Sequence, residues 1–216
     1  MPTSHKDITV LIADDHPTTR AGIRAILETT PDIRIIGEVE NGFQVEKTVA
    51  ALQPNILLLD LIMPGPKPAQ LEKSIRAQFP EIITLVLTAH DRDAYLATMM
   101  DMGVAGFLCK TETGETLVAA IRLAASGLSI FTEDQCRRAL SWRHLAGEKW
   151  KSLTAREREV LHLIMEGRDN KYIAKELGIT SKTAAYHVTS ILKKLNVKCR
   201  HEAIAWVQRY LPDNLD

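Results

Sequence analysis

The chain has 216 residues, of which 45% are hydrophobic and 25% charged, and its 27 basic side chains are balanced by 27 acidic ones. No run approaches the roughly 18 consecutive apolar residues of a membrane span, and the first residues lack the apolar stretch of a signal peptide. These features exclude a membrane protein and predict a cytoplasmic location. The three cysteines, Cys109, Cys136 and Cys199, have no metal-ligand spacing and are expected to stay reduced.

The length and the distribution of charge indicate two domains. A chain of this length is long for one average domain and sufficient for two domains with real cores. Residues 1–150 contain 15 basic and 19 acidic side chains, whereas residues 151–216 contain 12 and 8. Because solvated helix faces explain many such surpluses, the positions of the basic residues must decide whether they contact a polyanion.

The segment ITVLIADDHP, residues 8–17, is a short apolar run that ends in two adjacent carboxylates, Asp14 and Asp15. Its apolar part, residues 10–12, is typical of a strand buried on both faces. In open parallel α/β sheets, ligands bind outside the carboxyl ends of the strands, and two like charges there favour a hard divalent cation. This segment alone leaves a second interpretation open, a solvated turn in which an aspartate caps the next helix.

Three further apolar runs end in polar side chains, at Asp60, Thr88 and Lys110. The runs that precede them cover residues 56–59, 82–87 and 105–109. Helical patterns lie between the strands, at about residues 18–29, 44–52, 69–79, 92–101 and 113–126. This alternation favours parallel strands, whose carboxyl ends would bring carboxylates, a hydroxyl and an ammonium to one edge of a sheet.

Residues 7–127 resemble the receiver domain of response regulators. The resemblance rests on Asp14, Asp15, Asp60, Thr88 and Lys110, in this order and at strand ends, with Phe107 three residues before the lysine. It implies a doubly wound (βα)5 fold of the flavodoxin type, and we assign residues 1–127 to this domain.

The same resemblance implies that Asp60 accepts a phosphoryl group. Such a transfer needs an in-line nucleophile and neutralisation of the charge on the transferred oxygens. The resemblance further implies that Mg²⁺ is held by Asp15, Asp60 and the backbone carbonyl of Ile62, with Asp14 acting through water.

The resemblance also implies a switch. Lys110 would pair with a phosphoryl oxygen, and Thr88 would move toward the phosphoryl group and leave space for Phe107 to rotate inward. One departure lies beside Asp60, where Pro66-Lys67-Pro68 replaces a loop that usually ends in glycine. The two prolines stiffen this loop.

Residues 154–206 predict four short helices. Thr154 and Glu157 have the spacing of a capping box, and Gly167 ends the helix that they begin. Asn170 is expected to cap the second helix and Thr180 the third, which follows a tight turn. In the third helix Ala184, Val188, Ile191 and Leu195 form one buried stripe. This is a helix-turn-helix arrangement, in which the helix after the turn enters the major groove.

Residues 152–207 resemble the LuxR-type DNA-binding domain, and together the two resemblances imply a NarL/FixJ-class response regulator. Lys182, Tyr186 and Thr189 are expected to reach base edges or adjacent phosphates, and the other lysines to meet phosphates. Ala185 stands where the family usually carries a lysine. The complete DNA-contacting set that we predict is Lys171, Lys182, Thr183, Ala185, Tyr186, Thr189, Lys193 and Lys194.

A fourth helix, at about residues 200–210, serves for dimerisation in that family. We expect Ala203, Trp206 and Val207 to form the contact, and we assign residues 151–216 to the DNA-binding domain.

Residues 128–150 connect the two domains, and their pattern predicts a helix near residues 133–145 followed by a hinge at Gly147-Glu148-Lys149. Trp142 and Trp150 are large apolar side chains in this polar stretch. They either pack on the surface of one domain or form a contact between domains or protomers, and the sequence leaves both interpretations open.

The expected fold class is therefore α/β plus all-α, a receiver followed by a four-helix helix-turn-helix domain. The expected function is transcription regulation, in which a histidine kinase phosphorylates Asp60 and the regulator then binds DNA as a homodimer. One alternative is a regulator that binds DNA or protein without phosphorylation. Another is an enzyme, but no second catalytic constellation appears in the sequence, so we expect self-dephosphorylation only.

Overall fold

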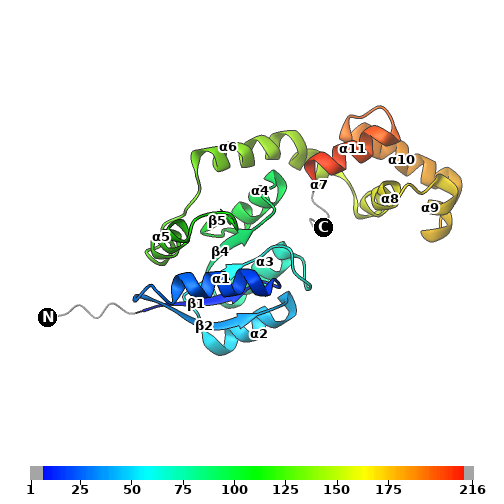
Figure 1. The fold of residues 1–216 in the computed structure, drawn as a ribbon. Helices are drawn as coiled ribbons and strands as arrows, with labels where there is room; N and C mark the ends of the chain where they lie inside the picture. The colour runs from blue at the N-terminus through cyan, green and yellow to red at the C-terminus, as the bar shows by residue number, and fades with distance from the viewer. Residues whose placement is uncertain (1–6, 212–216) are drawn as a thin grey trace. The chain divides into compact units, whose positions relative to one another are not determined.

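The computed structural model describes residues 7–211, which form two compact units that we describe separately (Figure 1). Residues 1–6, in which the sequence showed no signal peptide, and residues 212–216, at the end of the predicted DNA-binding domain, lie outside this range. The first unit extends to Arg137 and the second begins at Arg138. Within the described residues, no helix is both long and apolar enough to cross a membrane.

The first unit alternates five strands with five helices. Its elements are β1 (Ile8–Ala13), α1 (Pro17–Leu27), β2 (Ile33–Val39), α2 (Gly42–Leu52), β3 (Ile56–Leu59), α3 (Pro68–Gln78), β4 (Ile83–Thr88), α4 (Asp93–Met102), β5 (Gly106–Cys109) and α5 (Gly114–Ala125). The strands are parallel and lie in the order β2-β1-β3-β4-β5, which confirms the doubly wound fold.

The burial of each strand matches its place in the sheet. All four residues of β3 and the last four of β1 are buried, as expected for central strands covered on both faces. The side chains of β2 are mostly half-buried, in keeping with its place at one edge. Helices α1 and α5 contact each other and supply the core on one face of the sheet, while α2, α3 and α4 contact one another in series.

The register of the strands brings their carboxyl ends to one edge. Ala13 pairs with Leu59, Leu59 with Val86, and Val86 with Phe107. The residues that follow β1 and β3 are further tied by a backbone hydrogen bond from Asp60 N to Ala13 O, at 2.8 Å. The polar residues after these strands therefore meet in one place.

The free edge of β5 is covered by the chain that follows α5. Ile130 forms a parallel bridge with Gly106 and donates its N–H to Ala105 O at 2.6 Å. Gln135 Nε2 donates to Phe107 O at 2.8 Å. A Cβ atom on Gly106 would lie 3.1 Å from Ile130 O, so a glycine is needed where the two backbones approach.

The second unit is helical throughout. It contains the later part of α6 (Glu133–Trp142), a π-helical turn η1 (Arg143–Gly147), and the helices α7 (Glu148–Ser152), α8 (Ala155–Met165), α9 (Asn170–Glu176), α10 (Ser181–Leu195) and α11 (Arg200–Tyr210). The predicted helix in the connecting segment is confirmed, and the backbone stays helical through residues 147–149, so the hinge expected there stays a prediction. Gly147 serves packing, since a Cβ atom there would lie 3.1 Å from Trp142 Cζ3.

Both tryptophans of the connecting segment pack inside the second unit. Trp142 is buried, and its Nε1 donates to Tyr210 O at 2.9 Å. Trp150 lies under the guanidinium of Arg158, 4.6 Å from the ring centroid. Of the two interpretations left open, the structure favours packing on a single domain.

The caps of the helix-turn-helix segment are local and mostly as expected. Thr154 and Glu157 form the predicted capping box, and Thr180 accepts from Thr183 N at 3.1 Å. The cap of α9 is Asp169, which accepts from Tyr172 N at 2.8 Å, and not Asn170 as predicted. Asn170 is the first residue inside that helix.

Candidate functional site

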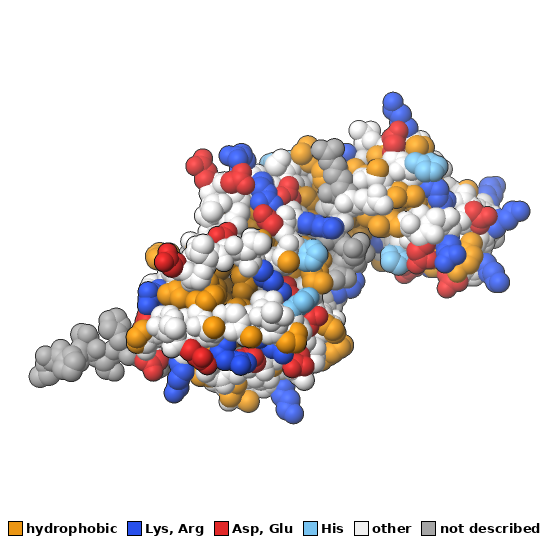
Figure 2. Space-filling view, in the orientation of Figure 1, with side chains coloured by type: hydrophobic (Ala, Val, Ile, Leu, Met, Phe, Trp, Pro, Cys, Tyr) orange, Lys and Arg blue, Asp and Glu red, His pale blue; other side chains and the backbone are white. Residues whose placement is uncertain are grey.

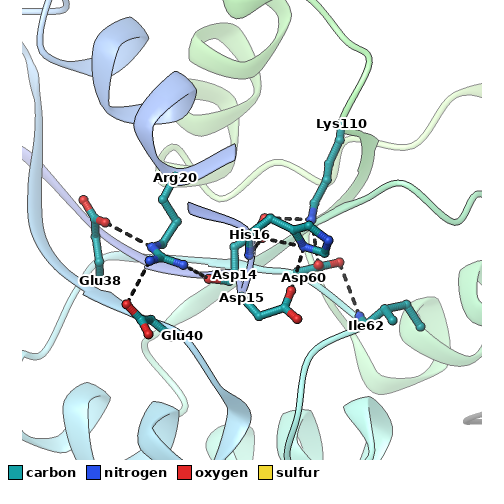
Figure 3. A network of polar contacts seen from close by, with 9 residues as sticks. All are labelled: Asp14, Asp15, His16, Arg20, Glu38, Glu40, Asp60, Ile62 and Lys110. Atoms are coloured by element: carbon teal, nitrogen blue, oxygen red, sulfur yellow. Dashed lines mark hydrogen bonds and ion pairs between the residues drawn. The ribbon is translucent and has the colours of Figure 1, made fainter. Parts of the chain in front are cut away.

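The residues of the predicted phosphorylation site lie at the carboxyl ends of four strands of the first unit. Asp14 and Asp15 follow β1, Asp60 follows β3, and Lys110 follows β5 (Figure 3). Thr88 is the last residue of β4, and Lys110 N donates to its carbonyl at 2.9 Å. Asp14, Asp60 and Thr88 are at most 4% exposed. The structure brings the carboxylates of Asp14, Asp15 and Asp60 together beside Lys110 and places Thr88 at the end of the neighbouring strand.

Lys110 bridges two of the carboxylates. Its Nζ lies 2.6 Å from Asp60 Oδ2 and 2.8 Å from Asp14 Oδ2. Burial raises the pKa of Asp60 above its ordinary value, and the hydrogen bond and charge of Lys110 oppose this shift only in part. Burial lowers the pKa of Lys110, but its hydrogen bonds to Asp14 and Asp60 outweigh that effect and leave the pKa raised. The lysine is thus held as a cation against its two acids.

The acidic pocket has the donor set of a hard divalent cation. Ligand atoms of Asp14, Asp15, His16 and Asp60 all lie within 4.8 Å of one another. Asp15 Oδ1 is buried, and His16 Nδ1 lies 2.7 Å from it. Carboxylate oxygens that converge in this way fit Mg²⁺. The ligand role of the Ile62 carbonyl stays a prediction, since the structure shows only its N–H donating to Asp60 Oδ1 at 3.3 Å.

The two residues of the expected switch are both buried. The Thr88 hydroxyl accepts from His90 N at 3.1 Å. Phe107 is 2% exposed, and the rotation expected of it stays a prediction. The carbonyl of Phe107 is the acceptor of Gln135, which connects the switch strand to the beginning of α6.

Arg20 adjoins the site, although the sequence patterns do not single it out. It is buried on α1, and its Nη1 donates to Asp14 O at 2.7 Å (Figure 3). Its position three residues before Ile23 and seven before Leu27 puts it on the buried stripe of the helix. A charged residue on such a stripe is the signal that could have revealed it.

The predicted recognition helix, α10, exposes the side chains expected to reach DNA. Tyr186 is 71% exposed, and Lys182, Thr189 and Lys193 are exposed as well, as is Lys171 on α9. Ala184, Ile191 and Leu195 are buried, which confirms most of the inward stripe, while Val188 is half-buried. Figure 2 shows Lys and Arg side chains projecting from the end of this unit where α9 lies.

Two members of the predicted DNA-contacting set have partners inside the unit. Lys194 Nζ lies 2.6 Å from Glu157 Oε2 and donates to Ser152 O at 2.8 Å. Thr183 shares a hydrogen bond of 2.8 Å between its hydroxyl and that of Thr180. Because its ammonium is already paired, Lys194 holds α10 against α8, and this placement argues against the predicted phosphate contact.

The prediction that three side chains of α11 form the dimer contact must be corrected. Ala203, Trp206 and Val207 are buried inside the second unit, where they form part of its core. The face of α11 that is exposed carries His201, Glu202, Ala205 and Gln208. The family pattern identifies the helix, but only the packing of the unit identifies the face.

Arg168 and Arg200 lie near Lys171, but neither belongs to the predicted DNA-contacting set. A shallow pocket of about 490 Å³ is lined by residues 167–171 together with Arg200. Arg168 lies over the ring of Tyr172 at 4.6 Å, and Arg200 Nη1 donates to Asn170 Oδ1 at 3.3 Å. No local pattern could have indicated Arg200, because it comes from α11, about 30 residues away.

Comparison with protein families matches both units. Residues 10–122 match the response regulator receiver domain, and residues 151–207 match the luxR family of bacterial regulatory proteins. The chain belongs to the NarL/FixJ class of response regulators. It is thus a two-component response regulator with a LuxR-type DNA-binding domain.

Curated relatives match over nearly their whole length. The transcriptional regulatory protein LiaR of Bacillus subtilis strain 168 is 36% identical over 205 residues, which cover 94% of this chain and 97% of LiaR. The nitrate/nitrite response regulator protein NarL of Escherichia coli K12 is 34% identical over 221 residues, or 96% of this chain and 98% of NarL.

A solved structure gives the same correspondence. RcsB from Salmonella enterica serovar Typhimurium, bound to promoter P1flhDC in the presence of the phosphomimetic BeF3⁻, is 30% identical and superposes with a TM-score of 0.66. The match covers 93% of this chain and 98% of that RcsB chain.

Proposed function

We propose that a histidine kinase phosphorylates this regulator on Asp60 in a Mg²⁺-dependent reaction, and that the modification promotes a homodimer that binds specific DNA. The observation that carries the proposal is the convergence of Asp60, Asp14 and Lys110, in which the ammonium lies 2.6 to 2.8 Å from the two carboxylates at the sheet edge. RcsB, solved on promoter DNA with a phosphomimetic, supports the coupling of the two units by family likeness.

The chemistry follows from the residues present. An oxygen of Asp60 attacks the phosphorus of a phosphohistidine, the phosphorus–nitrogen bond breaks, and the imidazole leaves. Asp15 and Asp60, with Asp14 beside them, would hold Mg²⁺, which would neutralise charge on the transferred oxygens. Lys110 exchanges its contact with Asp60 for a phosphoryl oxygen, and the Thr88 hydroxyl donates to another. Water hydrolyses the resulting acyl phosphate, and we propose no other enzymatic activity.

Phosphorylation adds a charge of about −1.5 to −2 to a pocket in which Lys110 supplies positive charge. The ammonium and the Thr88 hydroxyl are drawn to this charge; Thr88 ends β4, which pairs with β5, and Lys110 directly follows β5, the strand that contains the switch residue Phe107. The motion therefore begins at β4 and β5 and passes to the elements that pack on them.

Labelling by radioactive acetyl phosphate tests the proposal. Asp60→Asn should abolish the label, because an amide oxygen is too weak a nucleophile, while far-ultraviolet circular dichroism stays unchanged. Asp91→Asn, at an exposed position after β4, is the matched control and should keep the wild-type label. Wild-type labelling of Asp60→Asn would show that Asp60 is not the acceptor. Full DNA binding without any labelling of the wild type would favour the phosphorylation-independent regulator.

A further inference from the structure

Arg20 makes three polar contacts behind the acidic pocket. Its Nη1 donates to Asp14 O at 2.7 Å, its Nη2 to Glu40 Oε1 at 2.9 Å, and its Nε lies 3.4 Å from Glu38 Oε2. The side chain is only 10% exposed. Such a planar group with several fixed partners holds its neighbours in one geometry.

The contact with Asp14 O fixes the peptide that leads into Asp15. The other side of Asp14 is also held, because its N–H donates to Val39 O at 3.1 Å and its Oδ1 accepts from His16 N at 2.8 Å. Asp15 itself is 29% exposed at its side chain, and its Oδ1 lies 2.7 Å from His16 Nδ1. The direction of the Asp15 carboxylate therefore depends on a peptide plane that Arg20 holds from the carbonyl side.

Arg24 provides an internal comparison one helical turn later. It binds the same Glu38, with Nε at 2.8 Å and Nη2 at 2.6 Å from Oε1. Its side chain is 48% exposed, however, and no contact with Asp14 or Asp15 is seen in the described structure. The two arginines thus share a charge and a partner but differ in their contact with the site.

We propose that Arg20 is a positioning residue for the divalent cation, which acts by orienting the Asp14–Asp15 peptide. This inference rests on the proposed function of the site. It makes a prediction opposite in sign to simple electrostatics, because removing a cation beside an acidic pocket should strengthen the binding of Mg²⁺. Loss of a positioning contact should instead weaken it.

Calorimetric titration of the full-length protein with Mg²⁺ distinguishes the two effects. For Arg20→Met we expect a dissociation constant about tenfold higher than that of the wild type, the lower end of what loss of an orienting partner costs a metal site. Arg24→Met should bind Mg²⁺ as tightly as the wild type or slightly more tightly. Urea unfolding of each variant gives the stability separately, and a purely structural role would lower stability without changing the Mg²⁺ affinity.

Arg20→Lys keeps the charge but cannot reach all three acceptors with a planar fork, so it should also weaken Mg²⁺ binding. If Arg20→Met does not fold, the Mg²⁺ affinity of Arg20→Lys tests the positioning role of Arg20. Wild-type Mg²⁺ affinity in the folded variant overturns the inference, and so does tighter binding. Failure of the wild type to bind Mg²⁺ or accept label would instead overturn the proposed function of the pocket, so the two failures remain distinguishable.

Discussion

At the scale of single residues, the buried acid Glu157 helps to hold the second unit together. It accepts from Lys194 at 2.6 Å, from Ser190 Oγ at 2.6 Å and from Thr154 N at 2.7 Å. Burial alone would raise its pKa, but the hydrogen bonds from these partners lower the pKa to about 2. Its charge therefore stabilises the folded unit.

The pH dependence of that stability follows from the sign of the shift. A carboxyl group with a lowered pKa stabilises the folded state fully above its ordinary value of 4.5 and loses this effect as the pH falls toward about 2. Glu157→Gln should lower the free energy of unfolding at pH 7 by roughly 1–3 kcal/mol, because it removes the charge from these hydrogen bonds, and should flatten the acid limb. Tryptophan fluorescence is the measurement, because Trp142, Trp150 and Trp206 all belong to the second unit. An unchanged acid limb in the variant would contradict the assignment.

Tyr186 and Lys193 are expected to contribute to DNA binding in different ways. Lys193 is exposed near the end of α10, so Lys193→Ala should weaken binding to all sequences and reduce the salt slope by about 1. Tyr186→Ala should instead change which bases are preferred. Selection of bound sequences and titration at several salt concentrations measure the two effects. Equal losses on specific and random DNA for Tyr186→Ala would show that it does not read bases.

At the scale of elements, helix α3 carries a buried acid on its inner face. Glu72 lies between Leu71 and Ile75 on that face and is 2% exposed, and its Oε2 has no hydrogen-bond partner in the described chain. Burial raises the pKa of Glu72, and the Thr84 hydroxyl and the charge of Arg76 oppose the shift only in part. A charged carboxylate at this position costs stability.

The raised pKa of Glu72 predicts that the first unit loses stability as the pH rises. An acid with a raised pKa binds its proton more tightly when folded, so its favourable contribution is present below the ordinary pKa and lost as the pH passes the folded one. Glu72→Gln should therefore stabilise the unit at pH 8 but not at pH 4, while Glu81→Gln, at an exposed loop position, should change little. Urea unfolding followed by circular dichroism measures the stability of the first unit, whose unfolding phase tryptophan fluorescence does not report. Equal stabilisation at both pH values would disprove it.

Elements set by local sequence can be predicted, and those set by distant contacts cannot. The apolar runs of β1, β3, β4 and β5 and the caps at Thr154 and Thr180 are short-range signals, and the structure has them within a residue or two. Edge strand β2 gives no comparable signal, because its half-exposed residues form no continuous apolar run. Gly147 has the sequence context of a hinge, but it packs against a ring that the local pattern does not reveal.

The same distinction applies to the site. Strand ends and spacing are enough to predict that Asp14, Asp60 and Lys110 meet, because parallel strands align their carboxyl ends. Arg20 and Lys194 differ, since each is defined by a partner on another element. A lysine on a recognition helix looks the same in sequence whether it meets a phosphate or a buried glutamate.

At the scale of the whole molecule, two recognition helices must reach half-sites about 34 to 36 Å apart, or a multiple of that distance. We expect beryllofluoride with Mg²⁺ to shift the protein from monomer to dimer and to raise DNA affinity by roughly 5- to 150-fold, a coupling of about 1–3 kcal/mol. Analytical ultracentrifugation with and without operator DNA measures the shift. Gln208→Glu on the exposed face of α11 should weaken the dimer on DNA, whereas Trp206→Phe in the core should not. Unchanged mass and affinity at saturating beryllofluoride would refute the switch.

The cover over β5 has a consequence for how the protein can be divided. Because Ile130 and Gln135 satisfy backbone groups beside and within β5, a fragment that stops at residue 127 leaves an open strand edge at the border of the sheet. Open edges recruit strands from other chains, so such a fragment should self-associate through added strands. A fragment that continues to residue 137 carries its own cover and should stay dispersed in light scattering. The segment after α5 thus protects the sheet against unwanted polymerisation as well as leading to the next domain.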